Sequence, residues 1–174
     1  IESHSYQFIT YRLADSLPQK LLKKSPENAS PKEVSHHRQA MDQQLDKGYG
    51  SCLLKDYAPL IIDTWRHFEG IDYQIVAASV MPNHIHILIV LNGNRSLSKI
   101  IHSWKSYTSH EILKLIAQQQ KKEIGEHLWQ AGYWDRFIRD ERHFNNTVDY
   151  ILQNPVKAGL VKQIDQWPWS IFPK

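Results

Sequence analysis

Two histidines separated by a single residue, His84 and His86, are the first side chains whose types and spacing could support chemistry. They fall in an apolar, β-branched run that is typical of a strand, and alternate residues of a strand point to the same face of a sheet. Both imidazoles would then project side by side, with Ile85 and Ile87 on the other face. Such a pair can bind a divalent cation from two corners and needs a third ligand. Strand histidines that bind nothing are the alternative interpretation.

A tyrosine and an asparagine one helical turn apart form the second candidate. The segment 141–154 carries an apolar stripe at helical spacing, made of Phe144, Val148, Ile151 and Leu152. At about 100° per residue, Tyr150 and Asn154 lie off this stripe, on a polar face shared with His143 and Thr147. The amide could complete a metal site begun by the histidines, and the phenol could attack a phosphate that the metal polarises. A surface tyrosine and a helix-ending asparagine are the alternative.

Tyr107 is the other candidate nucleophile. It lies seven residues after Ile100 and three after Trp104, on the apolar stripe of a long predicted helix. This position favours packing in the core over catalysis. Spacing alone leaves both tyrosines open.

The strands and helices that must position these residues can be predicted from periodicity and turn residues. Strands are expected over four segments: 6–13, 73–81, 84–91 and 133–139. Helices are expected over 56–69, from Ser96 or Ser98 to about Gln120, and over 141–154, where Pro155 and Gly159 help to end the helix. The order β–α–β–β–α–β–α predicts an α+β fold, a ferredoxin-like antiparallel sheet with helices packed on one face. The apolar tail WPWSIF should dock back on the domain.

The stretch from about residue 15 to residue 55 has no clear place in this pattern. Residues 15–34 are polar and punctuated by prolines, which favours a loop, and a polar helix is predicted over 32–46. The stretch could be an added DNA-contacting element, but its composition favours a disordered loop. We therefore expect a single domain over 1–174 with a loop or insertion at about 15–55.

The composition is that of one globular domain. The chain has 174 residues, of which 41% are hydrophobic, and a net charge of +3 that is compatible with nucleic acid without requiring it. Cys52 is the only cysteine, which excludes an internal disulfide and a multi-cysteine zinc site. No run reaches the roughly 20 apolar residues of a membrane span, and the first residues lack a signal-peptide layout. We expect a cytoplasmic protein with no membrane partner.

Four blocks in the second half of the chain carry a family resemblance. In order, they are MPNHIHILIV, SWKSYTSHEI, LWQAGYWDRFIRDERHF and VDYILQNPVKAGLV. Together they resemble the single-tyrosine HUH transposases, where U is a hydrophobic residue, and most closely the branch associated with repetitive extragenic palindromes (REP). The resemblance covers about residues 73–172. It implies a ferredoxin-like core that cuts and rejoins single-stranded DNA at hairpin-flanked sites.

The resemblance also implies a role for each candidate residue. His84 and His86 would hold a divalent metal, Mg²⁺ or Mn²⁺. The family tyrosine lies on the helix before the N-P-V-K block, which selects Tyr150 over Tyr107 as the nucleophile that forms a 5′-phosphotyrosine. The third ligand is an amide four residues later, which selects Asn154 over the preceding glutamine.

Basic and aromatic side chains near these elements are candidate DNA contacts. Phosphates could be met by Lys105, Arg136, Arg139, Lys157 and Lys162. Unpaired bases could stack on Trp104, Trp134 or Trp167. Solvated lysines and core tryptophans are the alternative. The expected partner is single-stranded DNA with a hairpin, bound by a monomer or a homodimer, with the monomer favoured.

Two other functions stay open. A domesticated protein could bind palindromic hairpin DNA without transposition activity. An unrelated metal-dependent phosphoesterase could use the histidines while Tyr150 is structural. A covalent protein–DNA adduct that disappears on Tyr150→Phe would separate both from a transposase.

Overall fold

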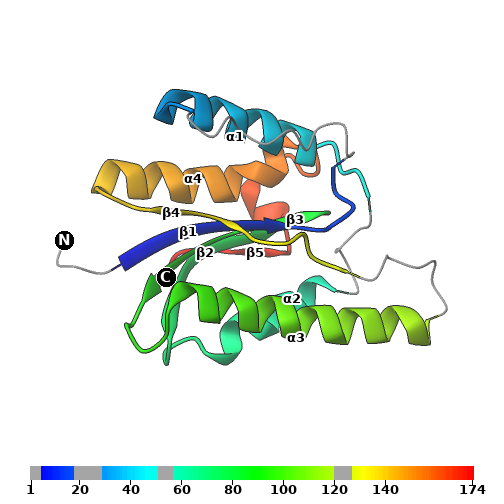
Figure 1. The fold of residues 1–174 in the computed structure, drawn as a ribbon. Helices are drawn as coiled ribbons and strands as arrows, with labels where there is room; N and C mark the ends of the chain where they lie inside the picture. The colour runs from blue at the N-terminus through cyan, green and yellow to red at the C-terminus, as the bar shows by residue number, and fades with distance from the viewer. Residues whose placement is uncertain (1–4, 18–28, 51–56, 120–126) are drawn as a thin grey trace.

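The computed structural model of the protein describes residues 5–17, 29–50, 57–119 and 127–174, which form one five-stranded antiparallel sheet between two layers of helices (Figure 1). The strands are β1 Ser5–Arg12, β2 Tyr73–Val80, β3 His84–Leu91, β4 Trp134–Phe137 and β5 Ser170–Ile171. Their order, β4-β1-β3-β2-β5, places β3 at the centre of the sheet. The predicted α+β fold with an antiparallel sheet is confirmed.

The helices are α1 Pro31–Leu45, α2 Ala58–His67, α3 Leu97–Gln118 and α4 Glu141–Lys157, followed by a 3₁₀ turn at Ile164–Gln166. The predicted end of the last helix at residue 154 is wrong, because α4 contains Pro155 and continues to Lys157. A proline removes only one backbone donor, which the last turn tolerates. Gly159 follows the end of the helix, and its φ of +73° lets Leu160 N donate to Pro155 O. Among the helices of the described ranges, none is long and apolar enough to span a membrane.

The predicted hairpin of β2 and β3 brings the two longest apolar runs together. Its break at Pro82-Asn83 is closed by Met81 N, which donates to His84 O at 2.9 Å. In the register of the pair, Val80 lies opposite Ile85. Because side chains alternate along β3, Ile85 points to the face opposite His84 and His86, as predicted.

The face of the sheet that carries Ile85 is covered by α2 and α3. The larger apolar cluster lies here, and the fully buried Trp65 of α2 packs against Trp104 of α3 with ring centroids 6.3 Å apart. The ring of Trp104 also meets Tyr73 of β2 at 5.2 Å. Large aromatic side chains dominate the energetics of such a core. This layer is the main hydrophobic core of the domain.

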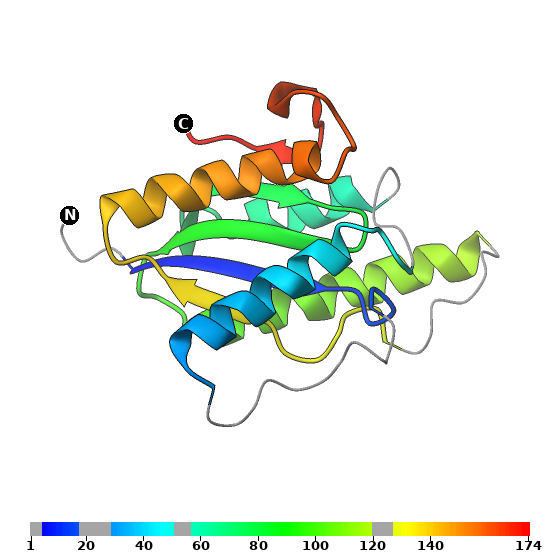
Figure 2. The ribbon, with the colours of Figure 1, turned by 90° about the horizontal axis from the view of Figure 1, so that it is seen from above.

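The prediction that helices cover only one face is wrong, because α4 and α1 lie on the other face (Figures 1 and 2). The apolar stripe of α4 places Ile151 in a second cluster with Phe8 of β1 and Leu88 of β3. A helix with one apolar stripe must bury it, and this face of the sheet offers apolar partners. The face of the sheet that carries the histidines is therefore covered by α4 and α1, which bury the polar side chains there.

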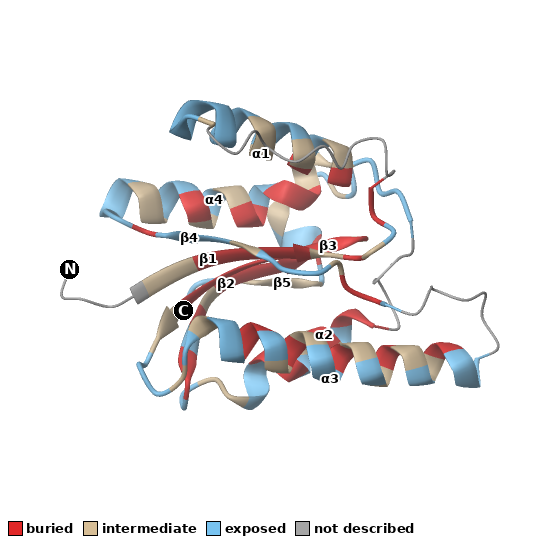
Figure 3. Ribbon diagram, viewed as in Figure 1, coloured by how far each residue is buried: buried red, intermediate tan, exposed pale blue. Residues whose placement is uncertain are grey.

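Helix α1 lies within the stretch that composition assigned to a disordered loop, and this assignment is wrong for residues 31–45. The predicted polar helix over 32–46 is present and starts one residue earlier. Ser30 and Glu33 form a reciprocal capping box, and Pro31 occupies the first turn, where its missing N–H costs nothing. Only the C-terminal end of α1 has buried residues, which face inward (Figure 3). The expected loop at 18–28 and 51–56 lies outside the described residues.

The C-terminal tail docks on the sheet edge, as predicted. Trp167 Nε1 donates to Val80 O at 3.1 Å, and Val80 N donates to Trp169 O at 3.0 Å. Ser170 and Ile171 then pair with β2. The tail thus covers the edge of the hairpin that carries the two histidines.

Candidate active site

The two histidines lie side by side on β3, with ring centroids 4.8 Å apart, and both are fully buried. His84 Nδ1 is 2.8 Å from Asn83 Oδ1, and His86 Nδ1 is 2.8 Å from Thr10 Oγ1 on β1. An amide oxygen accepts only, so His84 carries its proton on Nδ1 and keeps the Nε2 lone pair free. Partners of this kind fix the ring orientation of metal-binding histidines.

Burial keeps both imidazoles neutral. It lowers the pKa of His84 to about 3, and the nearby positive charge of Arg38 acts in the same direction. Burial also lowers the pKa of His86 well below its ordinary value, with smaller contributions from His84 and Arg38. The neutral form is the one that binds metals.

Several buried polar atoms on this face have no hydrogen-bond partner among the described residues. They include Nε2 of His84, Nε2 of His86 and Oδ1 of Asn154, and also Oδ1 of Asp42 and of Asp46. Buried polar atoms are normally hydrogen-bonded, so this group of unpaired atoms calls for an explanation. Across the described ranges, no three His, Cys, Asp or Glu side chains group as metal ligands. The amide of Asn154, the predicted third ligand, is 2% exposed.

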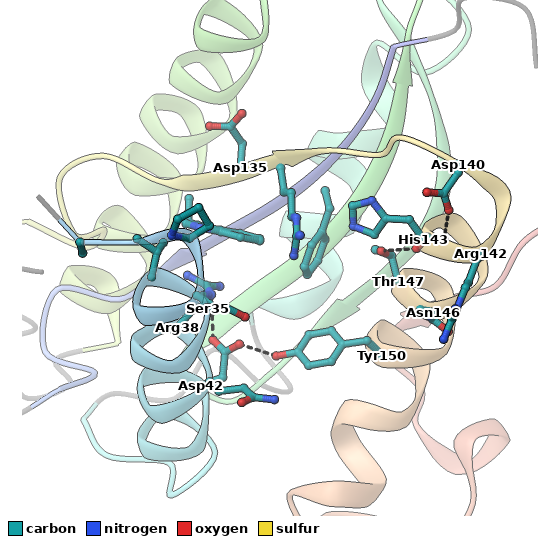
Figure 4. Close-up of a pocket in the computed structure, with 17 residues that line it drawn as sticks. Ser35, Arg38, Asp42, Asp135, Asp140, Arg142, His143, Asn146, Thr147 and Tyr150 are labelled. Atoms are coloured by element: carbon teal, nitrogen blue, oxygen red, sulfur yellow. Dashed lines mark hydrogen bonds and ion pairs between the residues drawn. The ribbon is translucent and has the colours of Figure 1, made fainter.

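Tyr150 projects from α4 toward the histidines and is half-buried. Its ring centroid lies 5.2 Å from that of His86 and 5.8 Å from that of Phe8. Its hydroxyl donates to Asp42 Oδ2 of α1 at 2.5 Å (Figure 4). Burial and the charge of Asp42 both raise the pKa of the phenol. The polar face predicted for α4 thus points into the protein.

Helix α1 supplies polar residues that sequence analysis missed. Arg38 Nε lies 3.3 Å from Asp42 Oδ1, and the guanidinium of Arg38 sits 4.3 Å from the ring centroid of Trp134. One turn further on, Asp46 Oδ1 is 4.0 Å from His84 Nε2. Burial and the charge of Asp42 raise the pKa of Asp46 to about 6, against the opposing charge of Lys157. These three charged residues are spaced four apart in the sequence, which would have predicted that they share one face of a helix.

A groove of about 770 Å³ opens between α1 and α4 beside Tyr150 (Figure 4). Aromatic side chains from β1 and β4, Phe8 and Trp134, line it, as do Arg38, Arg136 and Arg142. Basic and aromatic groups together suit nucleic acid. Of the predicted DNA contacts, Arg136 lines this groove, while Arg139, Lys157 and Lys162 are exposed around α4.

Three other predicted DNA contacts have side chains that are engaged within the protein. Lys105 lies on α3, across the sheet from the histidines, and its Nζ donates to Gln130 O at 2.7 Å and Gly132 O at 2.6 Å. Trp104 and Trp167 are 1% and 7% exposed, so neither ring can stack on a base. Both tryptophan side chains are buried and pack inside the protein, which was the alternative interpretation.

The prediction that Tyr107 packs in the core is also wrong. Its side chain is 53% exposed on α3, away from the histidines. The next residue, Thr108, takes the core position because its hydroxyl donates to Trp104 O at 2.7 Å and accepts from Trp129 Nε1 at 2.9 Å. Of these two tyrosines, Tyr150 is the one that contacts the histidine pair.

Replacing Trp104 should unfold the protein more easily. Trp104→Ala removes a buried ring and the bond from its Nε1 to Tyr73 Oη at 2.9 Å. We expect the free energy of unfolding to fall by about 3–5 kcal/mol, measured by urea denaturation. Tyr107→Ala on the same helix is the matched control and should cost less than about 1 kcal/mol. Equal, small effects would contradict the core assignment of Trp104.

The known proteins that this chain resembles are transposases. A family model described as "Transposase IS200 like" matches residues 61–154. A Haemophilus influenzae protein, provisionally named a REP-associated tyrosine transposase, is 31% identical over 136 residues, which are 75% of this chain and 74% of that protein. The REP-associated tyrosine transposase of Escherichia coli K12 is 33% identical over 102 residues, which are 58% of this chain and 54% of its own.

Two solved structures have a similar fold. One is a REP-associated tyrosine transposase bound to a REP hairpin; it matches 98% of this chain and 79% of its own length, with a TM-score of 0.57 and 22% identity. The other, a provisionally named transposase from Deinococcus radiodurans, matches 88% of this chain and 92% of its own length, with a TM-score of 0.50 and 12% identity.

Proposed function

Because this chain belongs to the IS200-like transposase family, with REP-associated tyrosine transposases among its relatives, we propose that it cuts and rejoins single-stranded DNA beside a hairpin. Tyr150 is the nucleophile, and His84, His86 and Asn154 hold a divalent cation. One observation carries this assignment: the ring of Tyr150 lies 5.2 Å from that of His86, in a buried histidine pair whose Nε2 atoms have no hydrogen-bond partner among the described residues.

The residues present fit a metal of the Mg²⁺ or Mn²⁺ type. Two imidazole nitrogens and one amide oxygen are a mixed N/O donor set, in which the imidazoles favour Mn²⁺, whereas Mg²⁺ is more available in cells. A bound cation would polarise the scissile phosphate and neutralise its developing charge. Asn83 and Thr10 keep the two imidazoles oriented toward it.

Tyr150 performs the covalent step. Its oxygen forms a bond to phosphorus while the bond between phosphorus and the 3′ oxygen breaks, which leaves a 5′-phosphotyrosine and a free 3′ end. The phosphodiester energy is conserved in the new bond, so rejoining needs no ATP. The sequence contains no G-x-x-x-x-G-K phosphate-binding motif, in keeping with this.

The proposed partner is hairpin DNA with single-stranded flanks. The solved relative that is bound to a REP hairpin supports this choice. On this chain, Arg136, Arg139, Lys157 and Lys162 are exposed and can meet phosphates.

The test uses a labelled DNA hairpin with randomised single-stranded flanks, incubated with the protein and Mn²⁺. We expect a covalent protein–DNA species on a denaturing gel, whose phosphorylated peptide contains Tyr150 by mass spectrometry. Chelation of the metal should remove it. Hairpin binding without an adduct would favour a domesticated DNA-binding protein, and free cleaved DNA without an adduct would favour a phosphoesterase. Either result would overturn the proposed function.

A further inference from the structure

We propose that Asp42 of α1 is the base that takes the proton from the Tyr150 hydroxyl as this oxygen attacks the phosphate. The inference rests on the proposed function and adds a catalytic residue to it. The buried carboxylate of Asp42 accepts a hydrogen bond from the hydroxyl of Tyr150, and neither the proposed metal nor the proposed nucleophile explains this contact.

The geometry is that of a base and its substrate proton. Asp42 is 9% exposed, and its Oδ2 accepts from the Tyr150 hydroxyl at 2.5 Å. A general base must lie within hydrogen-bond reach of the proton that it removes, and this contact satisfies the requirement before any DNA is bound. The histidines are less suited, because each uses Nδ1 for Asn83 or Thr10 and Nε2 for the proposed cation.

The charges around the pair suit proton transfer. The groups that face Asp42 and Tyr150 are Arg38 and Asp46 on α1, Lys157 on α4 and the neutral histidines of β3. Burial raises the pKa of Asp42, which strengthens it as a base, and the charge of Arg38 opposes this effect. Burial and the charge of Asp42 raise the pKa of Tyr150, so its hydroxyl needs a base to lose its proton, while the charge of Arg38 acts in the opposite direction.

Arg38 holds Asp42 in place. It forms an ion pair, at 3.3 Å, with the carboxylate oxygen of Asp42 that does not accept from Tyr150, and its guanidinium lies over Trp134 of β4. Figure 4 shows Asp42 between Arg38 and Tyr150, with the groove opening beside them. Helix α1 lies outside residues 61–154, so the base comes from a part of the chain beyond the family match.

The step balances in both directions. In cleavage, the phenolic proton moves to Asp42, the tyrosine oxygen binds phosphorus, and the 3′ oxygen leaves with the bonding electrons and takes a proton from water. In rejoining, the oxygen of a 3′-hydroxyl binds phosphorus and gives up its proton to water, the bond between phosphorus and the tyrosine oxygen breaks, and Asp42 returns its proton to the departing phenolate. No oxidant, reductant or further reactant is required.

Asp42→Asn tests the inference, because asparagine keeps the shape and an accepting oxygen but cannot take a proton at neutral pH. We expect adduct formation to slow by about 10²–10⁴-fold at pH 7. Hairpin affinity and Mn²⁺ affinity should stay within about twofold. Asp63→Asn removes an exposed carboxylate from α2, across the sheet, and serves as the matched control with wild-type rate.

The pH profile supplies a second readout. The wild-type rate should fall as the pH drops through the pKa of Asp42, since a protonated carboxyl cannot accept a proton. For Asp42→Asn that limb should vanish, and the rate should rise by about tenfold per pH unit because hydroxide takes over the role. Asp42→Glu restores a carboxylate and should recover most of the rate and the acid limb, which keeps the test decisive if Asp42→Asn proves unstable.

The outcomes separate the two proposals. No adduct from the wild-type protein would overturn the proposed function and this inference with it. An adduct from the wild type, with an equal or faster rate for Asp42→Asn, would overturn the inference alone. Failure of Asp42→Glu to restore activity, while it binds hairpin normally, would also overturn it.

Discussion

Tyr150→Phe is expected to abolish the covalent protein–DNA adduct and to leave hairpin binding intact. Removal of a nucleophile from a covalent mechanism costs about 10⁴-fold or more in rate. Phenylalanine keeps the ring that packs on His86 and Phe8, so the site should keep its shape. The loss would then be chemical and not structural. Adduct yield on a denaturing gel and hairpin affinity by fluorescence anisotropy measure the two effects.

Tyr107→Phe is the matched control for this substitution. Tyr107 is half-exposed on α3, on the opposite side of the sheet, so its hydroxyl should make no difference to the adduct. An adduct that persists in Tyr150→Phe, or that is lost equally in Tyr107→Phe, would contradict the assignment of the nucleophile.

His86→Ala is expected to weaken Mn²⁺ binding by more than about 100-fold, because loss of an outer-shell partner alone typically costs about 10–100-fold. The adduct should decline in parallel and should recover only in part at high Mn²⁺ concentration. Thr10→Val, which removes the partner of His86 Nδ1, should fall between the wild type and His86→Ala. Calorimetric titration with Mn²⁺ gives the affinities without reference to activity.

His110→Ala provides the control for the metal titration. His110 has a side chain that is 77% exposed on α3, and it takes no part in the buried pair. Wild-type Mn²⁺ affinity in His86→Ala would show that the two histidines are structural. In that case the orphaned Nε2 atoms would need another explanation.

The local part of the site could be predicted from the sequence. Alternation along a strand is a property of the backbone, so His84 and His86 were placed on one face without knowledge of the fold. The off-stripe position of Tyr150 on α4 followed from helical periodicity in the same way. Both depend only on neighbours within a few residues.

The burial of the site by α1 and α4 could not be predicted in this way. Arg38 and Asp42 lie in a polar helix whose composition resembles a solvated segment, and the partner of Asp42 is 108 residues away in the sequence. A charged side chain on such a helix gives no sign of burial, because the burial comes from α4 and the sheet. The same reason explains why helices on both faces were not foreseen.

Trp104 and Tyr107 on α3 show how a prediction from helical periodicity can fail. Trp104 was assigned to DNA and Tyr107 to the core, although they lie on one helix three residues apart. Their positions around the helix differ by only about 60°, and the exact width of the buried stripe decides between them. That width depends on how α2 and β2 pack against α3.

Both edges of the described sheet are short, four residues in β4 and two in β5. An edge strand offers unpaired backbone groups to any passing strand, and short edges limit that offer. Asp135 and Arg136 place charges on β4 as well, which disfavours strand addition. The short edges, together with the charges on β4, disfavour edge-to-edge pairing between the sheets of two copies of the chain.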